Sequence, residues 1–444
     1  MGRTMPNRVF AAIFRCMMSQ RIAITLLLML AGMGSQVSAG ENWPQFRGPG
    51  GQGICDVKNL PLTWSETQNV VWKTPIHGKA WSSPVIWKDQ IWMTTATPDG
   101  TELGVVCVDK ASGKILVDKV LFHIEHPQYC IAFNSYGSPT PCVEEGRVYV
   151  TFGSPGTACL DTRDASVIWT RTDFVCNHFR GAGSSPLLWN DLLIMDFDGS
   201  DFQFVVALDK RTGKNVWRTE RSIDFQDLNA DGKPKGEGDF RKAFSTPRIT
   251  TWENKPYLVS LGSHAVYCYD PASGKEYWRT EYRDGHSSAL TPVFGDNLAF
   301  TGTGAGATEI WALRLGGQGV INSTHVAWKF KKKAPTRPSP LYLDGLLYMT
   351  TDAGIVSCLD AKTGQDVWHG RIDGKYSASP IYAAGRIYFF SEEGKTAVLE
   401  ARRELKQLAE NALDDGIMAT PAVSGDALFI RTKTALYRVE NSGK

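Results

Sequence analysis

A Ser-Pro or Thr-Pro pair recurs eight times along this 444-residue chain, each time at the start of an apolar stretch. Successive prolines are 40 to 61 residues apart. That interval is the length of four short strands and their turns, so the repeat predicts the blades of a β-propeller. The eight prolines are Pro84, Pro139, Pro186, Pro247, Pro292, Pro340, Pro380 and Pro421.

Most repeats close on a second pattern, Asp-X-X-X-Gly-X-X-X-Trp. In this pattern the Asp side chain can bond to the backbone ahead of it, Gly can adopt a positive φ, and Trp is a large apolar group. We therefore predict a tight turn between two strands, with the Trp packed between neighbouring blades. The clearest copies are residues 209–217, 270–278 and 360–368.

The two ends of the array are complementary. The eighth repeat, from Ala419 to Val439, lacks the Gly-X-X-X-Trp close, whereas the segment 69–73, which contains Trp72, precedes the first opening. We expect this N-terminal strand to complete the last blade, because closure removes the free edges of an open array. The predicted fold is all-β: one eight-bladed propeller of four-stranded antiparallel blades over residues 40–444, closed by an N-terminal strand.

The N-terminus has the pattern of a secretory signal peptide. Four arginines and no acidic residue accompany the apolar run 22–33, and Val37-Ser38-Ala39 offers small residues for cleavage. The alternative is an uncleaved membrane anchor, but the run is shorter than the roughly 20 residues of a spanning helix. We expect residues 1–39 to be removed and the protein to be periplasmic or extracellular.

The charge of the mature chain gives no sign of a nucleic-acid partner. Four of the 48 basic residues lie in the signal, which leaves 44 against 46 acidic ones. The run Lys331-Lys332-Lys333 has no aromatic residues interleaved with it and is typical of a solvated loop. We expect no nucleic-acid binding, no transmembrane segment after cleavage, and a monomer.

Eight cysteines remain after the signal. Four of them occupy equivalent positions in apolar strands and are expected to be core residues: Cys107, Cys159, Cys268 and Cys358. Export permits disulfides, and the loop residue Cys130 is the best candidate, paired with Cys142 or Cys176.

The Ser-Ser-Pro opening and the Leu-Asp-X-X-Thr-Gly-X-X-X-Trp close resemble the repeats of quinoprotein-like eight-bladed propellers over nearly the whole mature chain. That superfamily includes pyrroloquinoline quinone (PQQ) dehydrogenases and non-catalytic propellers such as the BamB-type outer-membrane assembly factor. The segment 42–53, Asn-Trp-Pro-Gln-Phe-Arg-Gly-Pro-Gly-Gly-Gln-Gly, resembles the opening of secreted PQQ-like propellers of uncharacterised role.

The resemblance to the enzymes is incomplete. A PQQ dehydrogenase needs a Ca²⁺ ion with oxygen ligands and an Asp base, and commonly has a disulfide between adjacent cysteines. This chain has no Cys-Cys pair and no Cys-X-X-Cys-His haem segment. It also lacks the lipidated cysteine that follows the signal in BamB-type factors. We therefore expect no cofactor, and PQQ with Ca²⁺ is the alternative.

Loops that lead from one blade to the next should converge on the mouth of the central channel. Basic groups on these loops predict a site for an anion. We expect Arg180, Arg241 and Arg337 to lie there with too few carboxylates nearby. The alternative is that these groups bond to backbone carbonyls and acidic neighbours. The full candidate set is His178, Arg180, Arg241, Lys242, His286, Arg337 and Tyr376.

One segment has the start of a calcium loop. Asp227, Asn229 and Asp231 place oxygen atoms at alternate positions, and Gly232 follows. The twelfth position of the loop is Gly238 rather than Glu, so the pattern also fits a solvated surface turn.

The sequence thus predicts an exported propeller that is non-catalytic and binds a protein partner or a small anionic ligand, as an assembly scaffold. A PQQ-dependent alcohol or sugar dehydrogenase is the alternative.

Overall fold

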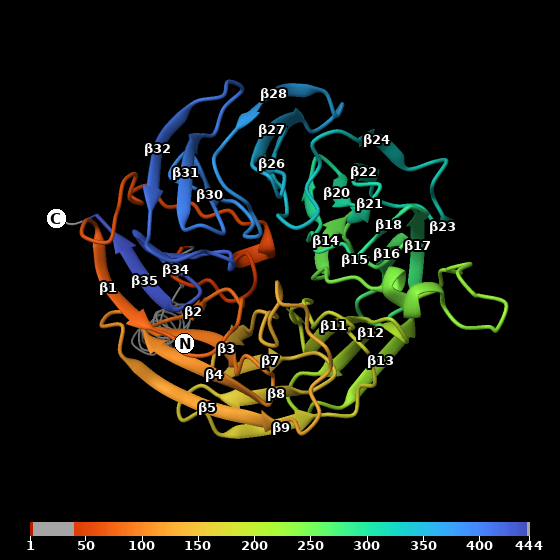
Figure 1. Cartoon of the computed structure of the whole chain (residues 1–444), viewed down its shortest axis with the longest axis horizontal. Coiled ribbons are helices and arrows are strands. Elements are labelled where there is room, and N and C mark those ends of the chain that lie inside the picture. The colour runs from red at the N-terminus through yellow and green to blue at the C-terminus, as the bar shows by residue number, and fades with distance from the viewer. Residues whose placement is uncertain (3–39, 442–444) are drawn as a thin grey trace. The chain divides into compact units, whose positions relative to one another are not determined.

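The computed structural model describes residues 1–2 and 40–441. The chain divides into two units, residues 1–39 and Gly40–Lys444, and all of the strands belong to the second unit. Eight of their nine sheets stand as blades around a common centre, and the ninth is a two-stranded ribbon (Figure 1). The predicted all-β eight-bladed propeller is therefore confirmed. Helix in the described residues is limited to two short 3-10 segments, η1 (Pro49–Gly51) and η2 (Lys235–Arg241).

Each blade is antiparallel, and its strands follow one another outward from the centre. Blade 1 contains β2 (Val85–Trp87), β3 (Gln90–Ala96), β4 (Glu102–Asp109) and β5 (Ile115–His123). Blade 2 contains β6 (Cys142–Glu144), β7 (Arg147–Thr151), β8 (Thr157–Asp161) and β9 (Val167–Arg171). Blade 3 contains β10 (Leu187–Trp189), β11 (Leu192–Asp198), β12 (Gln203–Asp209) and β13 (Asn215–Glu220). Blade 4 contains β14 (Arg248–Trp252), β15 (Lys255–Leu261), β16 (Ala265–Tyr269) and β17 (Glu276–Glu281), and the short β23 (Gly319–Val320) adds a fifth, parallel strand.

The second half repeats the pattern. Blade 5 contains β19 (Val293–Gly295), β20 (Leu298–Gly302), β22 (Ile310–Arg314) and β24 (Val326–Phe330). Blade 6 contains β25 (Leu341–Leu343), β26 (Leu346–Thr350), β27 (Ile355–Asp360) and β28 (Asp366–Arg371). Blade 7 contains β29 (Ile381–Ala383), β30 (Arg386–Phe390), β31 (Lys395–Glu400) and β32 (Gln407–Ala412). Blade 8 contains β33 (Ala422–Ser424), β34 (Ala427–Arg431), β35 (Ala435–Glu440) and the N-terminal β1 (Val70–Pro75). A small ribbon pairs β18 (Gly285–His286) with β21 (Ala305–Gly306).

The residue before each proline links neighbouring blades at the inner rim. In six of the eight steps its backbone N–H donates to the hydroxyl of its counterpart in the next repeat, over 2.9 to 3.0 Å: Ser83 to Thr140, Thr140 to Ser185, Ser185 to Thr246, Thr291 to Ser339, Ser339 to Ser379, and Ser379 to Thr420. These bonds involve all eight residues that precede a repeat-opening proline, and we call this set the hydroxyl ring.

The hydroxyl ring corrects one sequence assignment. The opening of the second repeat is Thr140-Pro141 and not Ser138-Pro139, because Thr140 carries the inter-blade bonds. The Ser138 hydroxyl instead donates to Asn134 within the preceding loop, over 2.6 Å. Both pairs fit the pattern, and only the partner across the blade boundary distinguishes them.

Tryptophan links neighbouring blades at the outer rim, as the repeat predicts. The Trp169 indole N–H donates to the Lys210 carbonyl of the next blade over 3.1 Å, and the Trp ring covers Gly213. A Cβ on Gly213 would lie 2.7 Å from that ring. Equivalent indole bonds join Trp72 to Lys110, Trp217 to Pro271, Trp328 to Ala361 and Trp368 to Arg402. We call this contact the Trp–Gly interlock.

The junction between blades 8 and 1 uses the N-terminal strand. β1 pairs with β35 in antiparallel register, from Val70 opposite Val439 to Pro75 opposite Ala435. Trp72 then makes the Trp–Gly interlock onto blade 1. At the inner rim of this junction Arg431 donates to the Ser82 carbonyl over 3.1 Å and to its hydroxyl over 2.6 Å.

Residues 40–57, which we call the plug, cross the end of the ring opposite the inter-blade loops that precede the prolines. Trp43 pairs with Ile86 of blade 1, Pro44 accepts the N–H of Val143 of blade 2, and Ile54 pairs with Tyr382 of blade 7. Gln52 exchanges hydrogen bonds with the backbone of Phe294 in blade 5. The segment whose sequence resembles secreted propellers thus contacts innermost strands around most of the ring.

Two sequence predictions concern cysteines and the signal. Cys130, Cys142 and Cys176 are all unpaired, so the expected disulfide is wrong. Cys142 lies in β6 and Cys176 on the loop between β9 and β10, and both are buried in one hydrophobic cluster. The predicted signal peptide falls on residues 1–39, nearly all of which lie outside the described residues. No helix in the described part of the chain is long and apolar enough to cross a membrane.

The Trp–Gly interlock can be tested at Gly213. Gly213→Ala meets the Trp169 ring and a φ of 71°, which together should lower the free energy of unfolding by about 2 to 4 kcal/mol. Gly385→Ala is the matched control, because its φ is 75° and no atom lies within 4 Å of the added Cβ. Urea unfolding of both variants gives the comparison, and equal losses would show that the contact with Trp169 contributes nothing.

A second prediction concerns ring closure. Removing residues 40–73 should open the junction between blades 1 and 8, because β35 loses its partner and the Trp72 interlock is lost. Trp72 alone should contribute about 3 kcal/mol. Differential scanning calorimetry of the truncated and mature chains measures the effect. An unchanged melting temperature would mean that β1 is not needed to close the ring.

Candidate functional site

A cavity of about 390 Å³ lies at the centre of the ring. Six members of the hydroxyl ring line its wall: Ser83, Thr140, Ser185, Thr246, Ser379 and Thr420. Phe46 of the plug lines it from one end, and the inter-blade loops line it from the other. The remaining lining is rich in apolar groups, among them Trp81, Ile131, Phe133, Phe244 and Met418. The cavity therefore combines an apolar wall with a band of hydroxyls.

The seven predicted mouth residues divide into three groups. Arg180, His286 and Arg337 line the central cavity. His178 and Tyr376 are buried behind it, where His178 accepts the N–H of Ser154 at Nε2 over 2.9 Å and Tyr376 donates to the Asp373 carbonyl. The other two, Arg241 and Lys242, are held in the segment that contains η2 and do not line the cavity. The structure thus brings together three of the seven.

The expectation that the three arginines lie far from carboxylates is wrong. Arg180 pairs with Asp239 over 2.8 Å, Arg241 donates through Nε to Asp227 over 2.8 Å, and Arg337 pairs with Asp352 over 3.1 Å and Glu392 over 3.3 Å. Asp239, Asp352 and Glu392 lie on other loops than their arginines, whereas Asp227 and Arg241 share the segment between β13 and β14. Ion pairs therefore neutralise the arginines of the mouth. This is the alternative that the sequence left open, in which these groups bond to acidic neighbours.

The other basic mouth residues are also in environments that disfavour charge. Burial lowers the pKa of His178 to about 4. Burial also lowers the pKa of His286, and the nearby His264 and basic residues lower it further. Burial, together with Arg180, lowers the pKa of Lys242 to about 7. Lys242 lies beside Asp239 and 4.6 Å above the Phe179 ring. Both histidines are consequently neutral at pH 7.

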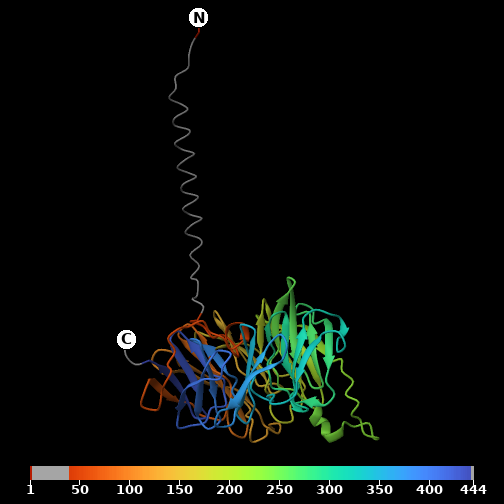
Figure 2. The same cartoon turned by 90° about the horizontal axis from the view of Figure 1, so that it is seen from above.

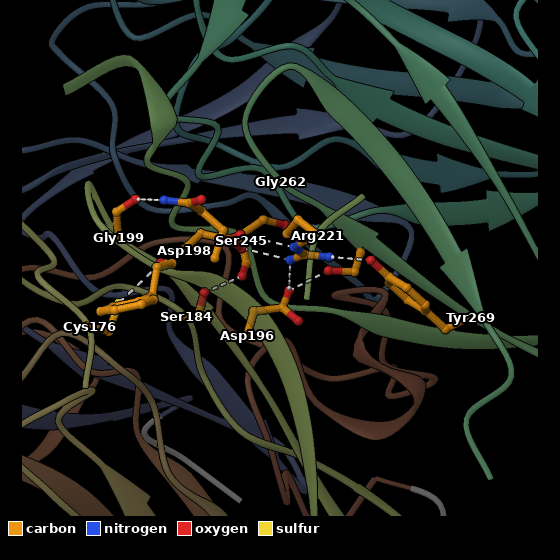
Figure 3. Close-up of polar contacts among 12 residues, drawn as sticks. Cys176, Ser184, Asp196, Asp198, Gly199, Arg221, Ser245, Gly262 and Tyr269 are labelled. Atoms are coloured by element: carbon orange, nitrogen blue, oxygen red, sulfur yellow. Dashed lines mark hydrogen bonds and ion pairs between the residues drawn. The ribbon is translucent and has the colours of Figure 1, made fainter. Parts of the chain in front are cut away.

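A buried charge cluster supports the loop that carries Asp239 and Lys242. Arg221 follows β13 and binds Asp198 through two hydrogen bonds of 2.9 and 2.6 Å (Figure 3). It also lies 3.4 Å from Asp196, whose carboxylate accepts the Ser260 hydroxyl over 2.6 Å. Burial raises the pKa of Asp196 to about 7. The charge of Arg221 acts in the opposite direction and lowers this pKa, whereas the charge of Asp198 adds to the increase. The sequence did not indicate this cluster, because Arg221 is separated from Asp196 and Asp198 along the chain by β12, β13 and the turns around them.

The segment from β13 to β14 extends beyond the strands in the side view (Figure 2). It carries the predicted calcium loop, but the carboxylate of Asp227 binds Arg241. Asn229 and Asp231 serve a local turn, in which Asn229 bonds through its backbone to Lys233 and Gly232, and the Asp231 carboxylate accepts the Lys233 N–H. Calcium binding here stays a prediction.

The cavity does not fit a quinone cofactor held by Ca²⁺. Calcium takes six to eight oxygen ligands, usually several carboxylates. Among the described residues Asp239 is the one carboxylate that lines the cavity, and it faces Arg180 and Lys242. Within residues 40–441 no group of three or more His, Cys, Asp and Glu side chains has the arrangement of a metal site. The donor set thus supplies no step of dehydrogenase chemistry.

The most informative residue at the mouth was not predicted from sequence. Phe133 lies on the loop between blades 1 and 2, and its ring is 4.4 Å from the guanidinium of Arg337, which lies on the loop between blades 5 and 6. These loops are on opposite sides of an eight-bladed ring, so Phe133 reaches across the mouth. The unusual length of the 124–141 loop and its aromatic content were the available signals.

Comparisons with known proteins agree with this architecture. A sequence model of the family described as outer membrane protein assembly factor BamB matches residues 63–220 and 201–443. A search of curated proteins found no match.

Solved structures with the same fold include BamB and dehydrogenases. BamB from Moraxella catarrhalis is 12% identical, with 83% of this chain and 99% of that chain covered and a TM-score of 0.55. The quinohemoprotein alcohol dehydrogenase from Comamonas testosteroni is 12% identical, with 92% and 82% covered and a TM-score of 0.66. A europium-containing methanol dehydrogenase is also 12% identical, with 90% and 91% covered and a TM-score of 0.62. At this identity the likeness shows the fold alone.

The buried charge cluster predicts a pH-dependent stability. Because the pKa of Asp196 is raised in the folded chain, the folded state keeps a proton that the unfolded state loses near pH 4. The contribution of Asp196 to stability should therefore decrease as the pH rises from about 4 to about 7.

Asp196→Asn removes this titration, so its stability relative to the wild type should increase over the same pH range. Urea unfolding at pH 5 and pH 7.5 measures the difference. Asp191→Asn, at an exposed position, is the control for the substitution itself. A stability of Asp196→Asn that does not change relative to the wild type between the two pH values would contradict the assignment.

Proposed function

The chain belongs to the family of outer membrane protein assembly factor BamB, and we propose that it is an exported, non-catalytic propeller that binds segments of other proteins on its mouth face. The mouth face is the side formed by the loops that precede each innermost strand.

One observation supports this proposal most directly. Among the described residues, the exposed large aromatic side chains are Tyr129, Phe133, Phe202 and Phe240, with exposed fractions of 42% to 63%. All four lie on mouth-face loops of blades 1 to 4. Exposed aromatic residues are enriched in protein interfaces, where they contribute most of the binding energy.

The four aromatic residues are carried by loops that contact one another. The Tyr129 and Phe179 rings are 6.3 Å apart, the Ser200 N–H donates to the Asn177 carbonyl over 2.8 Å, and Ser200 is packed against Gly238. The apolar side chains therefore belong to one continuous surface that spans blades 1 to 4. Such a surface suits an extended apolar segment of an unfolded protein.

We expect Phe202→Ser together with Phe240→Ser to weaken that binding about tenfold or more, because loss of two interface aromatics removes at least about 1.4 kcal/mol. The probe is an outer-membrane β-barrel protein, unfolded in urea and diluted onto the immobilised mature chain, and biolayer interferometry measures the affinity.

The matched control is Val167→Ser together with Val216→Ser, since these residues are exposed but lie on the outermost strands β9 and β13. Equal losses in both double variants, or no binding by the wild type, would reject the mouth face as the binding surface. Incubation with PQQ and Ca²⁺ tests the alternative function. Reduction of a dye with alcohols or aldoses under those conditions would show that the protein is an enzyme.

A further inference from the structure

The central cavity is covered at both ends by segments of this chain. Phe46 of the plug lies at the floor, and Ile131 and Phe133 of the loop between β5 and β6 lie at the opposite end. We call residues 128–134 of that loop the lid. A volume of about 390 Å³ between floor and lid lies within the range of small-molecule sites.

The backbone of the lid is attached firmly, whereas the Phe133 side chain is held loosely. Trp81 donates its indole N–H to the Phe133 carbonyl over 3.0 Å, and Asn134 donates to the Arg180 carbonyl over 3.0 Å. The Phe133 side chain, by contrast, is 42% exposed and rests on Arg337. A cation–π contact at an exposed site stabilises by about 0.5 to 1 kcal/mol, so the tip can leave Arg337 at little cost.

The hydroxyl ring gives the cavity wall an excess of hydrogen-bond donors. The hydroxyl oxygens of Thr140, Ser185, Thr246, Ser379 and Thr420 each accept a backbone N–H from the neighbouring repeat. None of these five hydroxyls donates to another group within residues 40–441. A hydroxyl carries one proton as well as its lone pairs, so each of the five retains a donor for a ligand.

Positive charge lies directly behind the floor. Arg47 is fully buried and, among the residues that the structure describes, bonds only to the carbonyls of Gln52 and Pro340, over 3.1 and 2.7 Å. Arg248 is also buried and donates to the carbonyl of Phe46, whose side chain lines the cavity. Neither guanidinium has a carboxylate within 4.0 Å among the described residues, in contrast to the paired arginines of the mouth. Burial lowers the pKa of each to about 9, which leaves both charged at neutral pH.

We propose that the central cavity binds a small organic anion, whose acid group accepts hydrogen bonds from the hydroxyl ring and whose apolar body packs against Phe46, Phe244 and Met418 beneath the lid. The unpaired charge of Arg47 and Arg248 favours an anion over a neutral molecule, because few counter-charges or water molecules screen it there. The ligand enters when Phe133 moves off Arg337. This site shares Tyr129 and Phe133 of the lid with the protein-binding surface proposed above, whereas its hydroxyl wall and floor are distinct from that surface.

Benzoate and its uncharged analogue benzamide are the probes, titrated into the mature chain by isothermal titration calorimetry. We expect benzoate to bind at least tenfold more tightly than benzamide, and Phe202→Ser with Phe240→Ser to leave this binding unchanged. Equal binding of the two probes, or no binding of benzoate, would overturn the proposal.

Two substitutions locate the site. Thr420→Val removes a hydroxyl of the cavity wall while keeping its shape, and should weaken benzoate binding at least threefold. Thr420→Ser keeps the hydroxyl and should retain binding. Thr291→Val is the control, since the Thr291 hydroxyl has no hydrogen-bond partner within the described chain and does not line the cavity. Binding that survives Thr420→Val unchanged would place the anion elsewhere; if that variant does not fold, Thr246→Val serves in its place.

The lid is tested by kinetics. Phe133→Ala should increase both the association and the dissociation rate of benzoate several-fold. Stopped-flow measurement of the total tryptophan fluorescence, to which Trp81 in the cavity wall contributes, gives both rates. Unchanged rates in this variant would show that the lid does not control entry.

Discussion

The hydrogen bond from a backbone N–H to the hydroxyl of the next repeat sets the position of the innermost strands. An N–H at the start of these strands is buried and must find a partner. The hydroxyl of the neighbouring Ser or Thr supplies one, and the proline after it has no N–H to satisfy. At the outer rim the Trp–Gly interlock likewise gives a turn carbonyl a donor from the blade before. These contacts fix the blades at the inner and the outer rim, so the inter-blade loops can differ in length and sequence. The loops carry the lid, the segment with η2 and the exposed aromatic residues.

The fold could be predicted because the repeat itself encodes both contacts. Ser or Thr before Pro and Trp four residues after Gly are local patterns, and spacing alone shows that there are eight. The one misplaced opening, Ser138-Pro139, arose where two adjacent pairs fit equally well and only the inter-blade bond of Thr140 distinguishes them. The cysteine pairing failed because Cys142 and Cys176 point into blade cores, a direction that position in the sequence does not reveal.

The site was less accessible to sequence reasoning. Arg180, His286 and Arg337 were assigned to the mouth correctly, since connections between blades converge there. The sequence did not predict that the two arginines would be neutralised. Asp239, Asp352 and Glu392 reach them from other loops, and repeat spacing carries no information on side-chain direction. Phe133 belongs to no repeat position at all. The charge that remains without a counter-charge lies at the other end of the cavity, on Arg47 of the plug and on Arg248 of β14, and neither residue stands in a sequence pattern that indicates burial.

The pairing of β1 with β35 has a consequence for the order in which the molecule forms. Val70 meets Val439, so a strand from the beginning of the folded unit finds its neighbour only in its last residues. Contacts between such distant residues form slowly, because a long loop must close first. During synthesis β1 is available early and its partner late, so an exposed strand edge and the uncovered Trp72 accompany most of the chain's emergence. The ring is thus a structure that only the final segment can complete, and the time before completion is when the chain is most open to other molecules.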